Sequence, residues 1–154
     1  MKKVSIIIPL YNLEKLIGKC IASALGQDLS PEEYEILVID DGSTDGSLAA
    51  AEKGHPNVHV YTKPNEGLSR TRNYGTDRAA GRYVMYLDAD DYLEPNVLGR
   101  LVETMECGGL DMLCFEIAGI DENGNDVPLW SDGISAGNGS DVQRGVDFLQ
   151  RDRF

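Results

Sequence analysis

The sequence predicts an α/β fold, in which a mostly parallel, doubly wound sheet carries helices on both faces. Apolar, β-branched strand segments alternate along the chain with segments whose apolar residues recur every three or four positions. The polar residues that directly follow three of the strand segments are Asn12, Asp40, Asp41, Asp88 and Asp90. Because the carboxyl ends of parallel strands meet along one edge of a sheet, we expect these side chains to line one ligand crevice.

The first strand and the first helix have the clearest patterns. Residues 4–9, VSIIIP, form the continuous apolar run of a strand that is buried on both faces. Residues 13–24 place apolar side chains on one helical face, and Asn12 is expected to cap this helix. The next elements, in order, are a strand over 34–39, a short helix over 47–53, a strand over 58–61, a helix over 68–80 closed by Gly81, and a strand over 83–87.

The last third of the chain has weaker signals. Pro95 suits the first turn of a helix that runs to about Cys107. Residues 110–117 are apolar enough for a further strand, and the Asn-Gly pair within 122–125 predicts a hairpin turn. The remaining segments are expected to be a Gly- and Ser-rich loop over 131–140 and a final helix over 142–150.

The composition excludes several classes of protein. The chain has 154 residues, with 14 Lys and Arg against 26 Asp and Glu, and a net charge of −12. This excess repels nucleic-acid phosphates, so we expect no nucleic-acid partner. No run approaches the ~18 apolar residues of a membrane span, so we expect no transmembrane segment in this chain. An anionic small molecule would need local countercharge, either a metal ion or clustered arginines.

The cysteines and the N-terminus bear on the compartment. Cys20, Cys107 and Cys114 include no C-x-x-C pair, which is typical of thiols in a reducing compartment. The N-terminal apolar run is interrupted by Pro9 and followed by charged residues, which argues against an export signal. We therefore expect a cytoplasmic protein, with peripheral attachment at the inner face of the membrane left open for a longer form.

Two other functions fit single acidic motifs but lack the context that these motifs need. The spacing from Asp41 to Glu52 matches an EF-hand calcium loop, but the segment that enters it is strand-like and not helical. Residues 36–41 are similar to the start of a phospho-receiver domain with Asp88 as phosphoacceptor. Such domains use a lysine late in the chain, however, and no lysine follows Lys63 in this sequence. The phosphate-binding glycine loops of P-loop and dinucleotide-binding proteins are absent from the sequence.

The Asp88-Ala89-Asp90 triplet is the candidate metal site. Alternate residues of an extended segment point to opposite sides, so one carboxylate can bind a metal while the other accepts a hydroxyl. A small number of hard oxygen ligands suits Mn²⁺ or Mg²⁺ shared with a diphosphate. Arg70 and Arg72 lie at a predicted helix start, where guanidinium and backbone N–H groups favour anions.

Four ordered blocks of this sequence resemble the family 2 glycosyltransferases. They are VSIIIPLYN at 4–12, VIDDGSTDGS at 38–47, NEGLSRTRNYG at 65–75 and AAGRYVMYLDADD at 79–91. The resemblance covers about residues 3–118 and implies a GT-A fold, a Rossmann-like fold of nucleotide-diphospho-sugar transferases. It implies that residues 1–118 are the nucleotide-sugar-binding core. Residues 119–154 would then be a hairpin, a Gly/Ser loop and the incomplete start of an acceptor-binding region, in a chain truncated at its C-terminus.

The resemblance also implies roles for residues around the nucleotide base. Pro9 and Tyr11 would line the base pocket, with the Tyr11 ring against uracil, although an ordinary core role for Tyr11 stays open. Asp41 would accept a hydrogen bond from the base N3–H, and Asp40 would support that loop. A pure capping role for Asn12 also stays open.

Further roles concern the ribose and the phosphates. Arg70 and Arg72 would face the nucleotide, and Asp88 would bind the ribose hydroxyls. Asp90 would hold the metal, Mn²⁺ or Mg²⁺, with Asp88 as a possible second ligand. Asp91 would either support this site or cap the following helix.

By this resemblance the protein is an inverting glycosyltransferase. It would move a sugar from a nucleotide-diphosphate donor, a UDP-sugar, to a hydroxyl of a glycan or lipid-linked acceptor, with a metal ion. The catalytic residue is unknown, and the base is expected beyond Phe154. An alternative is a nucleotide-sugar-binding module without a base, and the phospho-receiver domain is the remote one.

Overall fold

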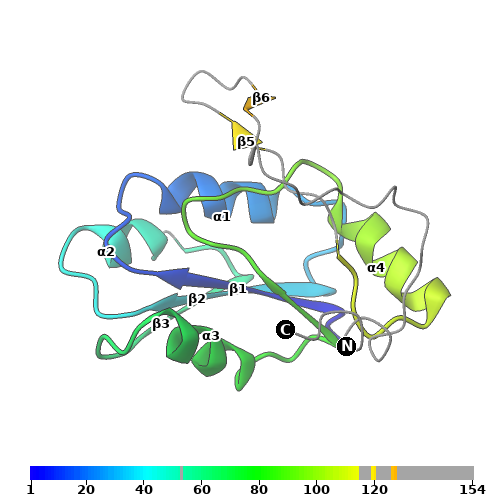
Figure 1. Cartoon of the computed structure of the whole chain (residues 1–154), viewed down its shortest axis with the longest axis horizontal. Helices are drawn as coiled ribbons and strands as arrows, with labels where there is room; N and C mark the ends of the chain where they lie inside the picture. The colour runs from blue at the N-terminus through cyan, green and yellow to red at the C-terminus, as the bar shows by residue number, and fades with distance from the viewer. Residues whose placement is uncertain (53, 115–118, 121–125, 128–154) are drawn as a thin grey trace, which may run out of the picture. The chain divides into compact units, whose positions relative to one another are not determined.

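In the computed structural model, residues 1–52, 54–114, 119–120 and 126–127 are described, and the chain divides into two compact units, Met1–Glu103 and Thr104–Phe154. The first unit contains a fully parallel sheet with the strand order β3-β2-β1-β4, which confirms the predicted α/β class (Figure 1). Its strands are β1 (Val4–Leu10), β2 (Tyr34–Asp40), β3 (Val58–Thr62) and β4 (Tyr83–Tyr86), and its helices are α1 (Ile17–Leu25), α2 (Ser47–Ala51) and α3 (Leu68–Thr76), with α4 (Leu98–Gly108) at the boundary of the two units.

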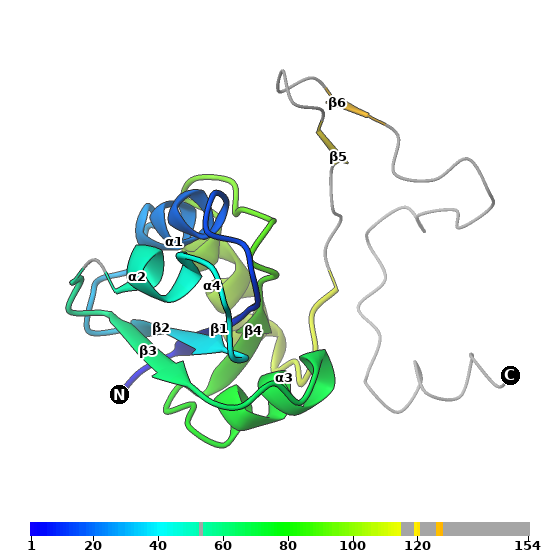
Figure 2. The ribbon, with the colours of Figure 1, turned by 90° about the vertical axis from the view of Figure 1, so that its left-hand side faces the viewer.

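The two central strands hold the core because their side chains are buried on both faces. On one face, Ile6 and Ile8 pack into a large cluster with residues of α1; on the other, Ile7 packs with Leu37 and Ile39 beneath α3. Figure 2 shows α1 and α2 on one side of the sheet and α3 on the other. Register pairs Leu10 with Asp40, so β1 and β2 end together and present the residues that follow them at one edge.

The second unit contains a short antiparallel pair of strands. β5 (Gly119–Ile120) pairs with β6 (Asp126–Val127), as the predicted hairpin requires. The turn itself, at 122–125, and the loop and helix predicted over 131–140 and 142–150 lie outside the described residues. No helix in the described part of the chain is long and apolar enough to cross a bilayer.

The predicted capping role of Asn12 is wrong. Helix α1 begins at Ile17, and residues 14–16 form a turn before it. Asn12 has a φ of 52°, in the left-handed region that Asn tolerates better than most residues. Its Oδ1 accepts a hydrogen bond of 2.8 Å from the backbone N–H of Thr44, so the side chain joins two loops instead of capping a helix.

Other boundaries differ from the prediction for identifiable reasons. Pro95 lies in a turn before α4, where Gln27 Oε1 accepts from the backbone N–H groups of Val97 and Leu98 and so caps the helix from outside.

The strand predicted over 110–117 is absent from its described part, 110–114. The start of that range instead belongs to the Schellman-type turn that closes α4, in which Gly109 has a φ of 58° and the backbone N–H of Leu110 donates to the carbonyl of Met105. Two predicted helices are also shorter than expected: α2 ends at Ala51 and α3 at Thr76.

Candidate functional site

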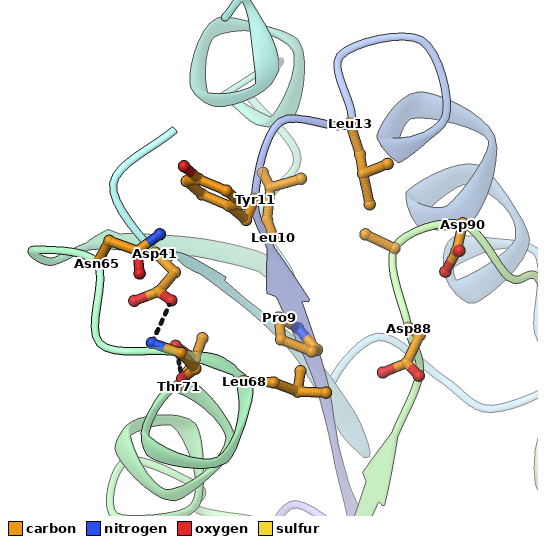
Figure 3. Close-up of a pocket in the computed structure, with 12 residues that line it drawn as sticks. Pro9, Leu10, Tyr11, Leu13, Asp41, Asn65, Leu68, Thr71, Asp88 and Asp90 are labelled. Carbon is orange, nitrogen blue, oxygen red and sulfur yellow. Dashed lines mark hydrogen bonds between the residues drawn. The ribbon is translucent and has the colours of Figure 1, made fainter. Parts of the chain in front are cut away.

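A cavity of about 420 Å³ opens at the carboxyl ends of β1 and β2, beside the segment that follows β4. In Figure 3, Tyr11 and Asp41 lie on one side of this pocket, Asp88 and Asp90 lie on the other, and Pro9 lies between them. These five predicted site residues therefore share one cavity. The remaining lining residues are Leu10, Leu13, Asn65, Gly67, Leu68, Thr71 and Ala89.

Asp41 is the most densely hydrogen-bonded carboxylate in the pocket. Its Oδ1 accepts from the backbone N–H of Glu66 at 3.0 Å and from the Lys63 ammonium, and its Oδ2 accepts from the backbone N–H of Gly67 at 2.9 Å. Burial raises the pKa of Asp41, but these hydrogen bonds outweigh burial and hold that pKa below its usual value. Asp41 is therefore an ionised, preoriented acceptor at the edge of the cavity.

Lys63, immediately after β3, is the partner that the sequence analysis missed. Its side chain is only 5% exposed, and its ammonium pairs with Asp41 and with Glu66 and also donates to the carbonyl of Pro64. Burial lowers the pKa of Lys63, but the hydrogen bonds to Asp41 and Glu66 raise it above its usual value. The sequence offered one signal for this residue, because Lys63 directly follows a strand that pairs with the strand carrying the acidic pair.

Asp40 lies beneath the pocket and does not line it. It is buried at the end of β2, where Oδ1 accepts from the backbone N–H of Ser43 and Oδ2 accepts from the Thr62 hydroxyl at 3.0 Å. The first contact fixes the loop that follows Asp41, and the second ties the end of β2 to the end of β3. In that loop, Gly42 has a φ of 73°, a conformation that favours glycine.

Neither of the two predicted arginines lines the cavity, but Arg72 pairs with a residue that does. Arg72 Nη2 donates to Asp88 Oδ1 at 2.6 Å, and the two side chains are 33% and 42% exposed. The Nε of Arg72 is buried without a hydrogen-bond partner. Arg70 is an exposed side chain that pairs with Glu66 four residues earlier, and it is not among the lining residues.

The acidic segment after β4 concentrates negative charge. Burial raises the pKa of Asp91, and the nearby carboxylates of Asp90 and Asp88 raise it further. Burial together with these three aspartates raises the pKa of Cys20 to about 12. A cation between Asp88 and Asp90 would relieve this repulsion, although within the described residues no three His, Cys, Asp or Glu side chains are placed to hold a metal together.

Tyr11 owes its position to the loop that Asn12 anchors. Its side chain is 48% exposed at the pocket rim, which is not the environment of an ordinary core tyrosine. Asn12 N–H donates to the Ser43 hydroxyl at 3.0 Å, so the loops after β1 and β2 are tied together directly beside Tyr11. The aromatic ring is therefore available to stack on a planar group.

The sequence analysis did not assign the α3 side of the pocket. Leu68 is half exposed at the first position of α3 and faces the cavity, and Thr71 is buried with its hydroxyl donating to Gly67. Asn65 lies in the loop before them. The only sequence signal for these residues was their place within the NEGLSRTRNYG block.

Comparison with known proteins places the chain in a family. The family model "Glycosyl transferase family 2" matches residues 5–144. The chain is 41% identical over 113 residues to the uncharacterized glycosyltransferase EpsJ of Bacillus subtilis strain 168, an alignment that covers 71% of the chain and 32% of EpsJ. It is 33% identical over 132 residues to the poly(ribitol-phosphate) beta-N-acetylglucosaminyltransferase TarS of Staphylococcus aureus strain Mu50, covering 83% of the chain and 23% of TarS.

Solved structures agree with the sequence matches. The structure of S. aureus TarS 1–349 in complex with UDP-GlcNAc has a TM-score of 0.68 at 34% identity and covers 71% of this chain and 32% of that one. The mannosyltransferase PcManGT from Pyrobaculum calidifontis, in complex with GDP-Man and Mn²⁺, has a TM-score of 0.61 at 25% identity and covers 68% of this chain and 31% of that one. The chain spans about a third or less of the length of these relatives. The described fold and the family model together show that the chain belongs to glycosyltransferase family 2.

Proposed function

We propose that this chain is the donor-binding part of an inverting, metal-dependent glycosyltransferase that uses a UDP-sugar. One observation carries the proposal: an aromatic ring, an ionised acceptor and a pair of aspartates line a single cavity of about 420 Å³. These are the groups that a planar base, a sugar hydroxyl and a metal-bound diphosphate require. The complex of TarS with UDP-GlcNAc supports this choice of donor.

The base would bind between Pro9 and Tyr11, with its N–H donating to Asp41. A carboxylate that stays ionised accepts and does not donate, so it favours a base whose edge presents an N–H. Uracil presents N3–H, whereas cytosine presents an unprotonated N3 at the same place. Asp40 would act from beneath, by holding the loop that carries Asp41.

Asp90 would hold the metal, with Asp88 binding the ribose hydroxyls or serving as a second metal ligand. The donor set fits Mn²⁺ or Mg²⁺, because the lining offers hard carboxylate oxygens in small number and leaves coordination positions for phosphate and water. The Mn²⁺ complex of the mannosyltransferase supports this class of ion. When bound, such an ion stabilises negative charge on a departing nucleoside diphosphate. Arg72 would add positive charge from the side of Asp88, and Arg70, displaced toward Glu66, would contribute only at longer range.

Among the described residues that line the pocket, no carboxylate is left for the catalytic base. Asp41 is paired with Lys63, Asp88 is paired with Arg72, and Asp90 is assigned to the metal. We therefore place the base outside this pocket, in an acceptor-binding region that begins near residue 119, after a donor-binding core over 1–118. There an acceptor hydroxyl of a glycan or lipid-linked sugar would lose its proton as it attacks the anomeric carbon. The lack of a free carboxylate among the described lining residues also favours a second candidate, a module that binds the nucleotide-sugar without turnover.

Calorimetry with UDP, with and without Mn²⁺, tests the proposal. We expect metal-dependent binding that Asp90→Ala abolishes, while Asp77→Ala, which removes the same charge from an exposed position after α3, leaves it unchanged. Binding of UDP that is equally metal-dependent in Asp90→Ala would refute the metal assignment, and no UDP binding by the chain would refute the function. Sugar transfer or donor hydrolysis by the chain would separate the enzyme from the binding module.

A further inference from the structure

Lys63 is a fully bonded ammonium behind the pocket wall. It does not line the cavity, and its three N–H donors have three acceptors: Asp41 Oδ1, Glu66 Oε2 at 3.3 Å and the carbonyl of Pro64 at 3.0 Å. With side-chain exposures of 5% and 6%, Lys63 and Asp41 are both removed from water. A pair buried to this degree costs desolvation, and a stable fold alone does not require it, because apolar residues of similar volume often do as well.

Its position links the ion pair to the cavity. Lys63 follows β3, and its backbone N–H donates to the carbonyl of Asp40, so β3 fixes where the side chain starts. The same carboxylate that accepts from Lys63 also accepts from the backbone N–H groups of Glu66 and Gly67, at the loop that leads into α3. One ammonium therefore holds both the acceptor of the pocket and the loop beside it.

We propose that Lys63 is the positioning residue for base selection: it keeps Asp41 ionised and aimed into the cavity, so that the site accepts a base with an N–H at that edge and rejects one without it. This inference rests on the proposed function. A pocket built around one hydrogen-bonding polarity discriminates strongly, because the wrong ligand leaves a buried group unpaired.

The charges around Asp41 make the proposal sensitive to pH in a defined direction. Asp40 precedes Asp41 at the end of β2. The Lys63 ammonium contacts Asp41 and also pairs with Glu66, and Arg70 of α3 pairs with Glu66 in turn. With Lys63 in place, the pKa of Asp41 is depressed, so the carboxylate stays ionised across the neutral range. Without Lys63, burial is opposed only by the remaining hydrogen bonds, so that pKa rises and the acceptor is lost progressively as the pH falls.

The experiment compares Lys63→Met with the unmodified chain by calorimetry with UDP and CDP between about pH 5.5 and 8, a range that lies above the usual pKa of an aspartate. We expect UDP affinity to fall about tenfold or more, which is the worth of one charged hydrogen bond. The preference for UDP over CDP should shrink, and the ratio of variant to unmodified Kd for UDP should widen as the pH falls. Lys2→Met removes the same charge at the opposite end of β1 and should change none of these values.

A double-mutant cycle with Asp41→Asn separates positioning from general stabilisation. If Lys63 acts through Asp41, adding Lys63→Met to Asp41→Asn costs little or no further UDP affinity. An equal loss in both backgrounds, or a folded Lys63→Met chain with an unchanged UDP-to-CDP ratio and an unchanged pH profile, overturns the proposal. If Lys63→Met does not fold, Lys63→Gln, which keeps a donor but not the charge, is held to the same criteria. Failure of the unmodified chain to prefer UDP would instead refute the proposed function, and this inference with it.

Discussion

Two glycines in helices of equal length make a matched test of how α3 is seated on the sheet. Gly18 lies in α1 and Gly75 in α3, and each helix has nine residues. A Cβ at Gly18 would have no atom within 4 Å, whereas a Cβ at Gly75 would lie 2.5 Å from Ile7 Cγ2 and 3.3 Å from Ile39 Cγ1. Both isoleucines are fully buried in the central strands and have no free space to move into.

The same substitution should therefore have opposite effects. Gly18→Ala removes the helix penalty of glycine and should stabilise the chain by about 0.5–1 kcal/mol. Gly75→Ala also removes the helix penalty of glycine, but its Cβ overpacks the core at a cost of about 1–3 kcal/mol. The net effect should therefore be a destabilisation of up to about 2 kcal/mol. For a domain of this size, each kcal/mol corresponds to a Tm change of about 2–4 °C.

Thermal unfolding followed by circular dichroism measures both variants. Because α3 carries Leu68, Thr71 and Arg72, displacement of the helix in Gly75→Ala should also weaken UDP binding, while Gly18→Ala should bind normally. A stabilised Gly75→Ala chain would show that α3 does not rest on Ile7 as described. A destabilised Gly18→Ala chain would show that the helix-propensity argument fails at that site.

Two further predictions concern the acidic segment after β4. Arg72→Gln should leave the Tm almost unchanged, because a half-exposed ion pair contributes less than about 1 kcal/mol to stability. The same change should weaken UDP binding about tenfold. A large fall in Tm with normal UDP binding would contradict the assignment of Arg72 to the nucleotide site. At pH 8, iodoacetamide should modify the exposed Cys107 and Cys114 but not Cys20, because burial and the neighbouring aspartates raise the pKa of Cys20 to about 12. Peptide mass mapping reads out the modified thiols, and modification of Cys20 in the folded chain would be inconsistent with its described environment.

The fold was largely predictable because its strongest signals are local. The continuous apolar runs of β1 and β2 could only be strands buried on both faces, and the structure buries every residue of both. Errors occurred where a tertiary contact replaced a local one. Asn12 bonds to a loop that is more than thirty residues away instead of capping α1, and Gln27 caps α4 from the segment that follows α1. No local pattern encodes either contact.

The candidate site was predictable only in part, for a related reason. The strand-end aspartates could be named because parallel strands end along one edge, and Asp41, Asp88 and Asp90 do share one cavity. Arg70 could not be separated from Arg72 by sequence, since both lie near the start of α3 and only side-chain geometry sends one to Glu66 and the other to Asp88. Lys63 carried no motif of its own.

The sequence by itself therefore determined the class of sheet, the edge where the cavity opens and the acidic residues at that edge, because strand burial and strand ends follow from short apolar runs. Only the tertiary structure decided whether those carboxyl groups are ionised and in which direction they point. Asp41 is an ionised, aimed acceptor because β3 places the Lys63 ammonium against it and the loop before α3 supplies two backbone N–H groups. A carboxylate's charge and direction depend on the groups packed around it, and those groups come together only when distant segments fold onto the same sheet.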